Sequence, residues 1–340
     1  MSSVLVVGGG PVGLAAASEA RLAGFSSVTV LEARDGPIDK ACGEGLMPGA
    51  LPLLARLGVS PRGFPLRGVS YRSSTAHVDH LFADGHGLGV RRTTLSAALH
   101  DRAVSLGVTF VSSRVESISQ DSSSVTAGDH TADWMLAADG LHSTVARLLN
   151  LQLPAPRARR RYGLRQHYRV EPWSDLIEVH FNRFGELYVT PTADGMVGVA
   201  LLARRGTDFG TALAASPSLA ARVAGASPAS ELRGAGPFRQ RTRARTAGRV
   251  LLVGDASGYV DAITGEGLRL GFDQARVAVS AIAVGDPQAY ERDWLRVTRD
   301  FRVLTSGLAL AASSPLHGAI VPLASRLPRV FAGAVERLAR

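Results

Sequence analysis

Cysteine and lysine are almost absent from this chain of 340 residues, which contains one of each, Cys42 and Lys40. A single cysteine cannot form a disulfide within the chain, and this fits a protein of the reducing cytoplasm. The sequence also lacks any run of eighteen or more apolar residues. We therefore expect a cytoplasmic protein without a transmembrane segment.

Aromatic residues are scarce as well, at 6% of the chain, although the formal net charge is +9. Nearly all of the positive charge is arginine, concentrated in residues 157–169 and 239–249. Surfaces that bind nucleic acid usually add stacking aromatics or a recognition helix, and neither accompanies these stretches, so we expect no nucleic-acid partner. The alternatives are solvated arginines or attraction of anionic groups, such as NADPH phosphates or a phosphopantetheine arm that carries the substrate on an acidic carrier protein.

The first residues have the pattern of a dinucleotide-binding unit. A short β-branched run at residues 4–7 precedes a glycine-rich turn and a helical stretch at 11–24. The turn places Gly8, Gly10 and Gly13 at G-x-G-x-x-G spacing. The first glycine permits a tight turn, the second lets a pyrophosphate approach the positive end of the helix, and the third lets helix and strand pack closely.

A second strand, residues 27–34, ends in Glu32, Ala33 and Arg34. A carboxylate about twenty residues beyond the glycines can accept hydrogen bonds from a ribose. The same carboxylate would repel a 2′-phosphate, which argues against NADP at this site. These residues alone do not choose between NAD and FAD.

Two later strands end in an aspartate followed by small residues. Asp139 precedes a helix start at Ser143, and Asp255 precedes a glycine-rich loop. That loop leads through Gly265 into a helix that starts near Gly267 and Leu268. A strand-end carboxylate suits a ribityl hydroxyl, and the helix start would aim N–H groups at the edge of a flavin that becomes negative on reduction. These features favour FAD.

Together these segments resemble the p-hydroxybenzoate hydroxylase superfamily of FAD enzymes. The resemblance rests on "GGGPVG…E", "AADGLHSTV" and "GDASGYVDAITGEG", in that order, and on "GVRRTTLSAAL" at 89–99. It implies that Arg92 lies beside the FAD phosphates. Within the superfamily, "KACGEGLMPG" and "ITGEGL" resemble the geranylgeranyl reductase branch. A proline that many relatives carry in the late loop is missing, with Asp261 and Ala262 in its place, so we expect this loop to be less rigid.

The rest of the chain alternates polar and apolar residues at 66–90 and 160–205, which predicts an antiparallel sheet. The resemblance implies an α/β fold in which this sheet is inserted into a Rossmann-type FAD-binding domain and covers the substrate pocket, with C-terminal helices. We assign the domains as follows: 1–65, 91–155 and 240–300 to a discontinuous FAD-binding domain, 66–90 and 156–239 to a substrate-binding domain, and 301–340 to a C-terminal helical region.

The C-terminal region should be broken at Pro315, Pro322 and Pro328. We expect its apolar faces to pack on the core or on a partner, with peripheral contact to a membrane as the alternative. His77 and His80 should lie on opposite faces of a predicted strand, so they would not converge on one metal ion. We therefore expect no metal site there. Residues 185–201 lie where flavin halogenases carry a tryptophan pair, which is missing here, and halogenation is therefore not expected.

The loop at residues 39–50 holds the candidate catalytic residues. The resemblance places it near the flavin, where Lys40 could attract the negative charge of the reduced ring or of the phosphates. Cys42 could protonate a substrate carbon, or it could simply line the pocket, which is the commoner role of a free cysteine. Glu44 could bond backbone N–H groups or act as an acid.

Two reactions compete for such a protein. As a monooxygenase it would use FAD, transient NAD(P)H and dioxygen to hydroxylate an apolar aromatic or polyketide-like small molecule. As a reductase it would reduce a carbon–carbon double bond of an isoprenoid. The loop sequence favours the reductase. The short chain and the missing aromatic-rich segment of those reductases favour hydroxylation; of that segment only Tyr188 and Pro191 remain. We therefore expect a monooxygenase, with the reductase as the alternative. A non-catalytic binding protein on the same scaffold is the alternative from another class.

Overall fold

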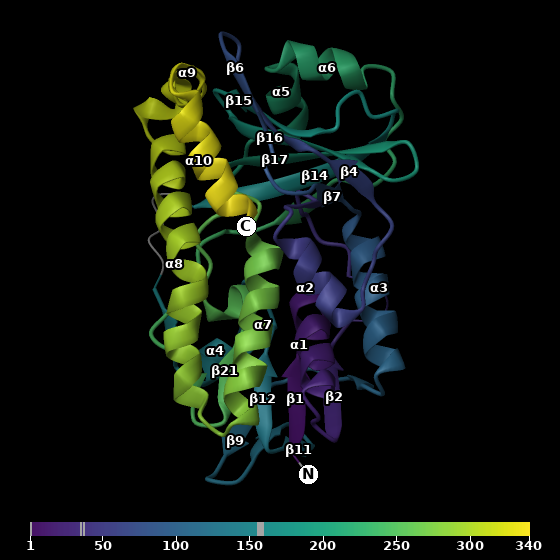
Figure 1. The fold of residues 1–340 in the computed structure, drawn as a ribbon, viewed down its shortest axis with the longest axis vertical. Helices are drawn as coiled ribbons and strands as arrows, with labels where there is room; N and C mark the ends of the chain where they lie inside the picture. Colours follow the sequence, from purple (N-terminus) through teal and green to yellow (C-terminus); the bar gives the residue numbers. More distant parts are fainter. Residues whose placement is uncertain (1, 35, 37, 155–159) are drawn as a thin grey trace.

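The structure is a computed structural model that describes residues 2–34, 36, 38–154 and 160–340. The start of the arginine-rich stretch at 157 and the expected domain boundary after residue 155 lie outside the described residues. Figure 1 shows an elongated molecule with one sheet and its covering helices in the lower half and a second sheet across the upper half. The long helix α8 runs beside both.

The lower sheet has six strands in the order β20-β21-β12-β1-β2-β8. All neighbouring pairs are parallel except β20 and β21. The strands are β1 (Ser3–Val7), β2 (Ser27–Glu32), β8 (Thr109–Ser112), β12 (Trp134–Ala137), β20 (Thr246–Ala247) and β21 (Val250–Leu252). The apolar run of β1 is explained by its central place, because a parallel strand covered on both faces is buried throughout. The predicted Rossmann-type architecture is confirmed.

Helices α1 (Pro11–Leu22), α2 (Ala50–Leu57), α3 (Arg92–Ser105) and α7 (Gly267–Ala283) cover this sheet (Figure 1). Two glycines allow helices α1 and α7 to pack closely against their neighbours. A Cβ on Gly13 would lie 1.9 Å from the carbonyl oxygen of Gly8, and one on Gly271 would lie 2.3 Å from Cγ2 of Val12. The first contact sets α1 against β1, and the second sets α7 against α1, so that both helices begin at the same end of the sheet.

The upper sheet has seven strands in the order β18-β14-β17-β16-β15-β5-β6. They are β5 (Gly68–Arg72), β6 (His77–Leu81), β14 (Arg161–Arg169), β15 (Leu176–Asn182), β16 (Gly185–Thr192), β17 (Met196–Arg204) and β18 (Arg233–Ala235). Our expectation of an antiparallel sheet is wrong at one pair, because β15 and β5 are parallel. These two strands come from separate chain segments, so no hairpin forces them to run in opposite directions.

The remaining elements are short. The strands are β3 (Gly45–Leu46), β4 (Phe64–Leu66), β7 (Gly87–Gly89), β9 (Ile118–Gln120), β10 (Val125–Ala127), β11 (His130–Ala132), β13 (Gln152–Leu153) and β19 (Arg241–Thr242). The helices are α4 (Thr144–Leu148), α5 (Phe209–Ala214), α6 (Pro217–Val223) and the 3₁₀ turn η2 (Gly254–Ser257).

The C-terminal part consists of α8 (Pro287–Ala312), η3 (Pro315–Ala319), α9 (Ile320–Arg326) and α10 (Pro328–Ala339). Helix α8 is continuous through residues 300 and 301, between which we expected the boundary of the C-terminal region. The expected break at Pro322 is wrong, since this proline lies in the first turn of α9, where its missing N–H costs no helical hydrogen bond. The chain end packs beside α2, where the N–H of Gly49 donates to the carbonyl oxygen of Ala339 at 2.7 Å.

Candidate active site

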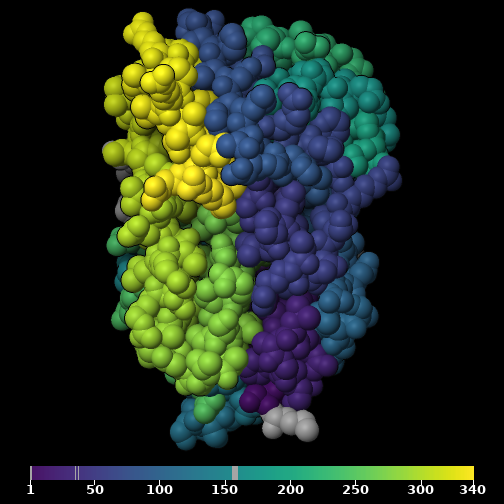
Figure 2. All heavy atoms as spheres, viewed as in Figure 1, coloured from purple at the N-terminus to yellow at the C-terminus, as the bar shows by residue number. Residues whose placement is uncertain are grey.

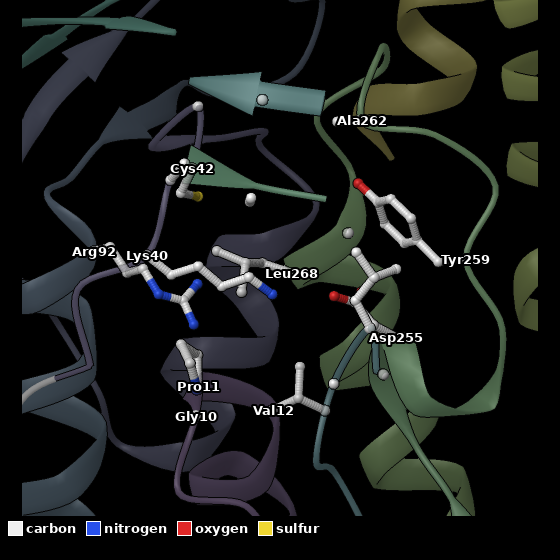
Figure 3. A pocket seen from close by; sticks show the side chains of 18 of the residues that line it. Gly10, Pro11, Val12, Lys40, Cys42, Arg92, Asp255, Tyr259, Ala262 and Leu268 are labelled. Atoms are coloured by element: carbon white, nitrogen blue, oxygen red, sulfur yellow. The ribbon is translucent and has the colours of Figure 1, made fainter. Parts of the chain in front are cut away.

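A cavity of about 630 Å³ lies between the two sheets, at the end where α1 and α7 begin. Every sequence-predicted site residue except Gly13 lines it: Gly8, Gly10, Glu32, Ala33, Arg34, Lys40, Cys42, Arg92, Asp139, Asp255, Gly265, Gly267 and Leu268. Gly13 lies one turn inside α1 and serves the packing against Gly8 described above. Residues far apart in the chain therefore meet in one cavity, part of which Figure 3 shows.

The start of α1 forms one end of this cavity. Gly10 is the residue before the helix and Pro11 is its first residue, so the free N–H groups of the first turn face outward. Figure 3 shows the guanidinium of Arg92 above Gly10 and Pro11. A Cβ on Gly10 would lie 3.9 Å from Nη2 of Arg92. A helix start, a glycine and an arginine together suit the two charges of a diphosphate.

The carboxylate of Glu32 lies at the end of β2. Its Oε2 accepts from the N–H of Gly9 at 2.8 Å, and its Oε1 accepts from the backbone N–H and the Nε of Arg34 at 3.0 and 2.9 Å. Burial raises the pKa of Glu32, but the bonds from Arg34 and Gly9 outweigh it and leave the pKa below its usual value. The carboxylate is thus held ionised and oriented to accept from ribose hydroxyls.

Asp255 lies at the start of η2, and Lys40 faces it. Figure 3 shows the Lys40 amine and the Asp255 carboxylate directed toward each other across the cavity. Burial raises the pKa of Asp255, and the positive charges of Lys40 and Arg92 oppose this rise. The carboxylate accepts no hydrogen bond from the described residues. A partly buried carboxylate without a hydrogen-bond partner in the protein is available to accept from a ligand hydroxyl.

Asp139 has a different environment. Its Oδ1 accepts from Oγ of Ser143 at 2.6 Å, and its Oδ2 accepts from the N–H of Val145 at 3.0 Å. Burial raises the pKa of Asp139 above its usual value, although these hydrogen bonds act to lower it. The carboxylate therefore fastens the start of α4 to the end of β12, which the sequence had not indicated, and it also lines the cavity.

Helix α7 provides the second helix start, with Gly267 and Leu268 on the cavity wall. Glu266, the residue before the helix, is buried, and its Oε2 accepts from Nε of Arg269 at 2.8 Å. Burial raises the pKa of Glu266 to about 7, although Arg269 opposes the rise. The first N–H groups of α7 give this end of the cavity a partial positive charge.

The loop before α7, expected to be less rigid without its proline, is held by side chains instead. The hydroxyl of Tyr188 donates to the carbonyl oxygen of Ile263 at 2.7 Å, and that of Thr264 bonds with Thr305 at 2.9 Å. Asp261 lies 3.6 Å from the guanidinium of Arg161 and accepts from the N–H of Ile263. Strand β16, strand β14 and helix α8 thus each contact this loop.

Glu44 and His167 form a buried pair that sequence reasoning missed. Glu44 has a positive φ of 59°, its Oε1 accepts from the N–H of Arg92 at 2.9 Å, and its Oε2 bonds with Nε2 of His167 at 2.5 Å. His167 belongs to β14 and also contacts Arg165, which in turn pairs with Asp39. The pair therefore joins the 39–44 loop to the upper sheet, and Glu44 serves as a structural anchor of the loop.

Cys42 lies two residues before this anchor. Its sulfur lines the cavity and accepts from the N–H of Glu44 at 3.5 Å. Figure 3 shows the Cys42 sulfur and Tyr259 on the cavity wall, while Lys40 points to Asp255 instead of the thiol. The Lys40 amine is therefore directed toward Asp255 and does not supply a positive charge beside the Cys42 thiol.

The upper sheet and α10 give the cavity an apolar wall with tyrosine hydroxyls. Its members include Val69, Tyr71, Leu164, Ile177, Val179, Tyr188, Ala200, Leu202, Val335 and Leu338. Burial raises the pKa of Tyr71 to about 12 and that of Tyr259 well above its usual value, so both phenols keep their protons at neutral pH. These hydroxyls can donate hydrogen bonds to an oxygen of a bound molecule.

The arrangement fits FAD. The start of α1 with Arg92 would hold the diphosphate, Glu32 the ribose, Asp255 the ribityl chain and the start of α7 the pyrimidine edge of the ring. The clearest support is the carboxylate of Asp255, which is partly exposed to this cavity and accepts no hydrogen bond from the described residues.

Comparison with known proteins agrees with this geometry. The family described as "FAD binding domain" matches residues 1–285. The menaquinone reductase of Mycolicibacterium smegmatis is 27% identical over 337 residues, which cover 86% of this chain and 79% of that protein. The rifampicin monooxygenase of Rhodococcus hoagii is 28% identical over 318 residues, which cover 81% of this chain but only 62% of the other.

Solved structures share the fold. The flavin-dependent halogenase CmlS superposes with a TM-score of 0.81 at 20% identity, covering 99% of this chain and 72% of the halogenase. The p-nitrophenol 4-monooxygenase PnpA of Pseudomonas putida superposes with a TM-score of 0.79 at 20% identity, covering 100% of this chain and 99% of the monooxygenase. The family match, together with a cavity built for the cofactor, shows that this chain belongs to the FAD binding domain family and is an FAD-dependent oxidoreductase.

Proposed function

We propose that this protein is a monooxygenase that uses NAD(P)H and dioxygen to hydroxylate an apolar aromatic or polyketide-like small molecule. The observation that carries the proposal is the wall of the cavity on the side of the upper sheet. It is lined by aliphatic side chains and by tyrosines whose pKa values are raised. Such a wall excludes water and positions an apolar ring, which are the main demands of flavin-dependent hydroxylation.

We assign different residues of the cavity to binding the cofactor and to binding the substrate. Bound FAD, reduced by NAD(P)H, supplies the activation of dioxygen. Arg92 and Asp255 would hold the cofactor at its diphosphate and ribityl parts, and the start of α7 would offer partial positive charge to the pyrimidine edge of the ring. The phenol of Tyr71, whose pKa burial raises to about 12, donates to a substrate oxygen. The similarity to rifampicin monooxygenases also supports the proposal.

A second candidate is reduction of a carbon–carbon double bond, as the branch resemblance suggests. Cys42 favours it, because its thiol lines the cavity and reduction requires a proton for the second carbon. The relative named as a menaquinone reductase adds weight to this alternative.

Cys42→Ala separates the two reactions. The purified FAD-loaded protein is given NAD(P)H and a panel of apolar phenols in air, and hydroxylated product and hydrogen peroxide are quantified. We expect product from wild type, and from Cys42→Ala a rate within about twofold, since a wall residue contributes no proton to hydroxylation. Peroxide as the sole product with every phenol, together with alkene reduction that Cys42→Ala abolishes, would exclude the hydroxylase.

A further inference from the structure

The C-terminal helices expose a series of large apolar side chains. Six of them, from the end of α8 through η3 and α9 to the start of α10, form what we term the apolar tip. With their exposed fractions they are Val303 67%, Leu310 51%, Leu316 64%, Leu323 57%, Leu327 47% and Val330 66%. Figure 2 shows these helices projecting at the upper left of the molecule. Exposed apolar groups are common singly, but a series on one projection marks an interaction surface.

The charged side chains within residues 301–335, which include the apolar tip, have one sign. Between Asp300 and Glu336 the sequence has no acidic residue. Its charged residues there are Arg302, Arg326 and Arg329. The last two are exposed, and neither forms an ion pair with a described residue. Apolar side chains flanked by unpaired arginines complement an anionic lipid surface, in which the chains enter the interface and the guanidinium groups remain at the headgroups.

The shape of this segment suits a protein that lies on a bilayer. No single helix among the described residues is long and apolar enough to cross a membrane. Residues Pro287–Ala312 and Pro315–Arg326 satisfy the length and composition together, but they are bent by 101°. A bend of this size places the apolar tip at a corner of the molecule, which can enter the interface without spanning it.

The same segment reaches the active site. Helix α10 begins at the apolar tip, and its residues Val335 and Leu338 line the cavity. Phe331 and Val335 are buried against the apolar side chains of the upper sheet. One helix therefore joins the exposed apolar surface to the wall that would contact a substrate.

We propose that the apolar tip docks on an anionic lipid bilayer and that the substrate is a lipid dissolved in that bilayer. The docking follows from the surface itself, whereas the substrate class rests on the proposed function. Vesicle binding is measured without NAD(P)H or substrate, so a failure of docking and a failure of hydroxylation give separate results.

The test is co-sedimentation of the FAD-loaded protein with vesicles of phosphatidylcholine, with and without phosphatidylglycerol. We expect binding that is stronger with phosphatidylglycerol and falls with salt. The double variant Leu316→Glu, Leu323→Glu should bind at least about tenfold more weakly. Arg326→Gln and Arg329→Gln should each lose about fivefold, and only on the anionic vesicles.

The matched control is Val284→Glu. Val284 is 76% exposed and follows α7, at the turn where α8 begins, far along α8 from the apolar tip (Figure 1). It should bind vesicles like wild type, and FAD content and melting temperature check the folding of each variant. The proposal is overturned if wild type does not sediment, or if Val284→Glu loses as much binding as the double variant. It is equally overturned if sedimentation velocity shows a wild-type dimer without vesicle binding that the double variant converts to monomer, since the apolar tip would then join two copies of the chain.

Discussion

At the residue scale, Asp255 is the carboxylate that we propose binds the ribityl chain of FAD, and it accepts no hydrogen bond from the described residues. Asp255→Asn keeps the shape but removes the charge that a ribityl hydroxyl would bond. We expect the dissociation constant for FAD to rise about tenfold or more, because a hydrogen bond to a charged group contributes roughly 1.5–3 kcal/mol. Fluorescence titration of the apoprotein measures it. Asp293→Asn, which removes a partly exposed carboxylate paired with Arg296, should leave the constant unchanged, and an equal effect of both variants would contradict the assignment.

His167 tests the anchor of the 39–44 loop. His167→Ala leaves the Glu44 carboxylate buried without its partner, and we expect the free energy of unfolding to fall by about 3 kcal/mol. His167→Gln can still donate to Glu44 and should lose less. Because Cys42 is the only thiol, its rate of modification by a thiol reagent reports on the loop, and this rate should rise several-fold in His167→Ala. The exposed His77→Ala is the control. An unchanged thiol rate in His167→Ala would show that the pair does not position the loop.

These residues also show what sequence reasoning could and could not predict. Gly8, Gly10, Glu32 and Asp255 follow from local spacing, because each lies at a strand end or a helix start that its own neighbouring residues indicate. The pairing of Glu44 with His167 spans 123 residues, and nothing local in β14 distinguishes this histidine from one facing solvent. Only the register of the upper sheet against the loop identifies it.

At the element scale, the contact between α1 and α7 sets where both helix starts point. Gly271→Ala would place a Cβ 2.3 Å from Cγ2 of Val12, and overpacking of this kind costs about 1–3 kcal/mol. We expect a lower melting temperature and weaker FAD binding, with partial recovery in the double variant Val12→Ala, Gly271→Ala. Gly307→Ala, in α8 with no atom within 4 Å of the new Cβ, should stabilise by roughly 0.5–1 kcal/mol. Equal effects at the two glycines would contradict this account.

The start of α7 should also give the protein a pH dependence through Glu266. Its pKa is about 7 in the folded protein against an ordinary value of 4.5, so the folded state binds this proton more tightly than the unfolded chain. The stabilisation is complete below the ordinary value and is lost as the pH rises through about 7. We expect the free energy of unfolding of the FAD-saturated protein to decrease from about pH 5 to about pH 8, by on the order of 3 kcal/mol at most.

Glu266→Gln provides the comparison for urea unfolding across this range. Its stability should decline less than that of wild type, since glutamine has no proton to lose. Identical slopes for the two proteins would show that Glu266 does not titrate in this window.

Element by element, the sequence was most informative where one strand leads into one helix. The segments at β1–α1, β12–α4 and β21–α7 matched expectation because glycine, aspartate and apolar periodicity act over a few residues. The parallel pair of β15 with β5 and the continuous α9 around Pro322 were missed. The first depends on two distant segments, and the second depends on where a helix begins relative to its proline.

At the scale of the whole molecule, two sheets and a C-terminal helix line one cavity, with the proposed cofactor cradle on one side and an apolar wall on the other. The cradle was predictable from motifs. The contribution of α10 to the wall was not, because it requires knowing that the chain end returns to pack beside α2.

We expect the reduced flavin bound in this cavity to transfer oxygen to an apolar ring. The most direct measurement mixes photoreduced, FAD-loaded protein with isotopically labelled dioxygen and a long-chain phenol, and analyses the products of a single turnover by mass spectrometry. The account predicts a hydroxylated phenol that carries the heavy oxygen isotope. Unlabelled phenol and stoichiometric peroxide with every compound tested, alongside anaerobic reoxidation of the flavin by a polyprenyl alkene, would contradict it and identify a reductase.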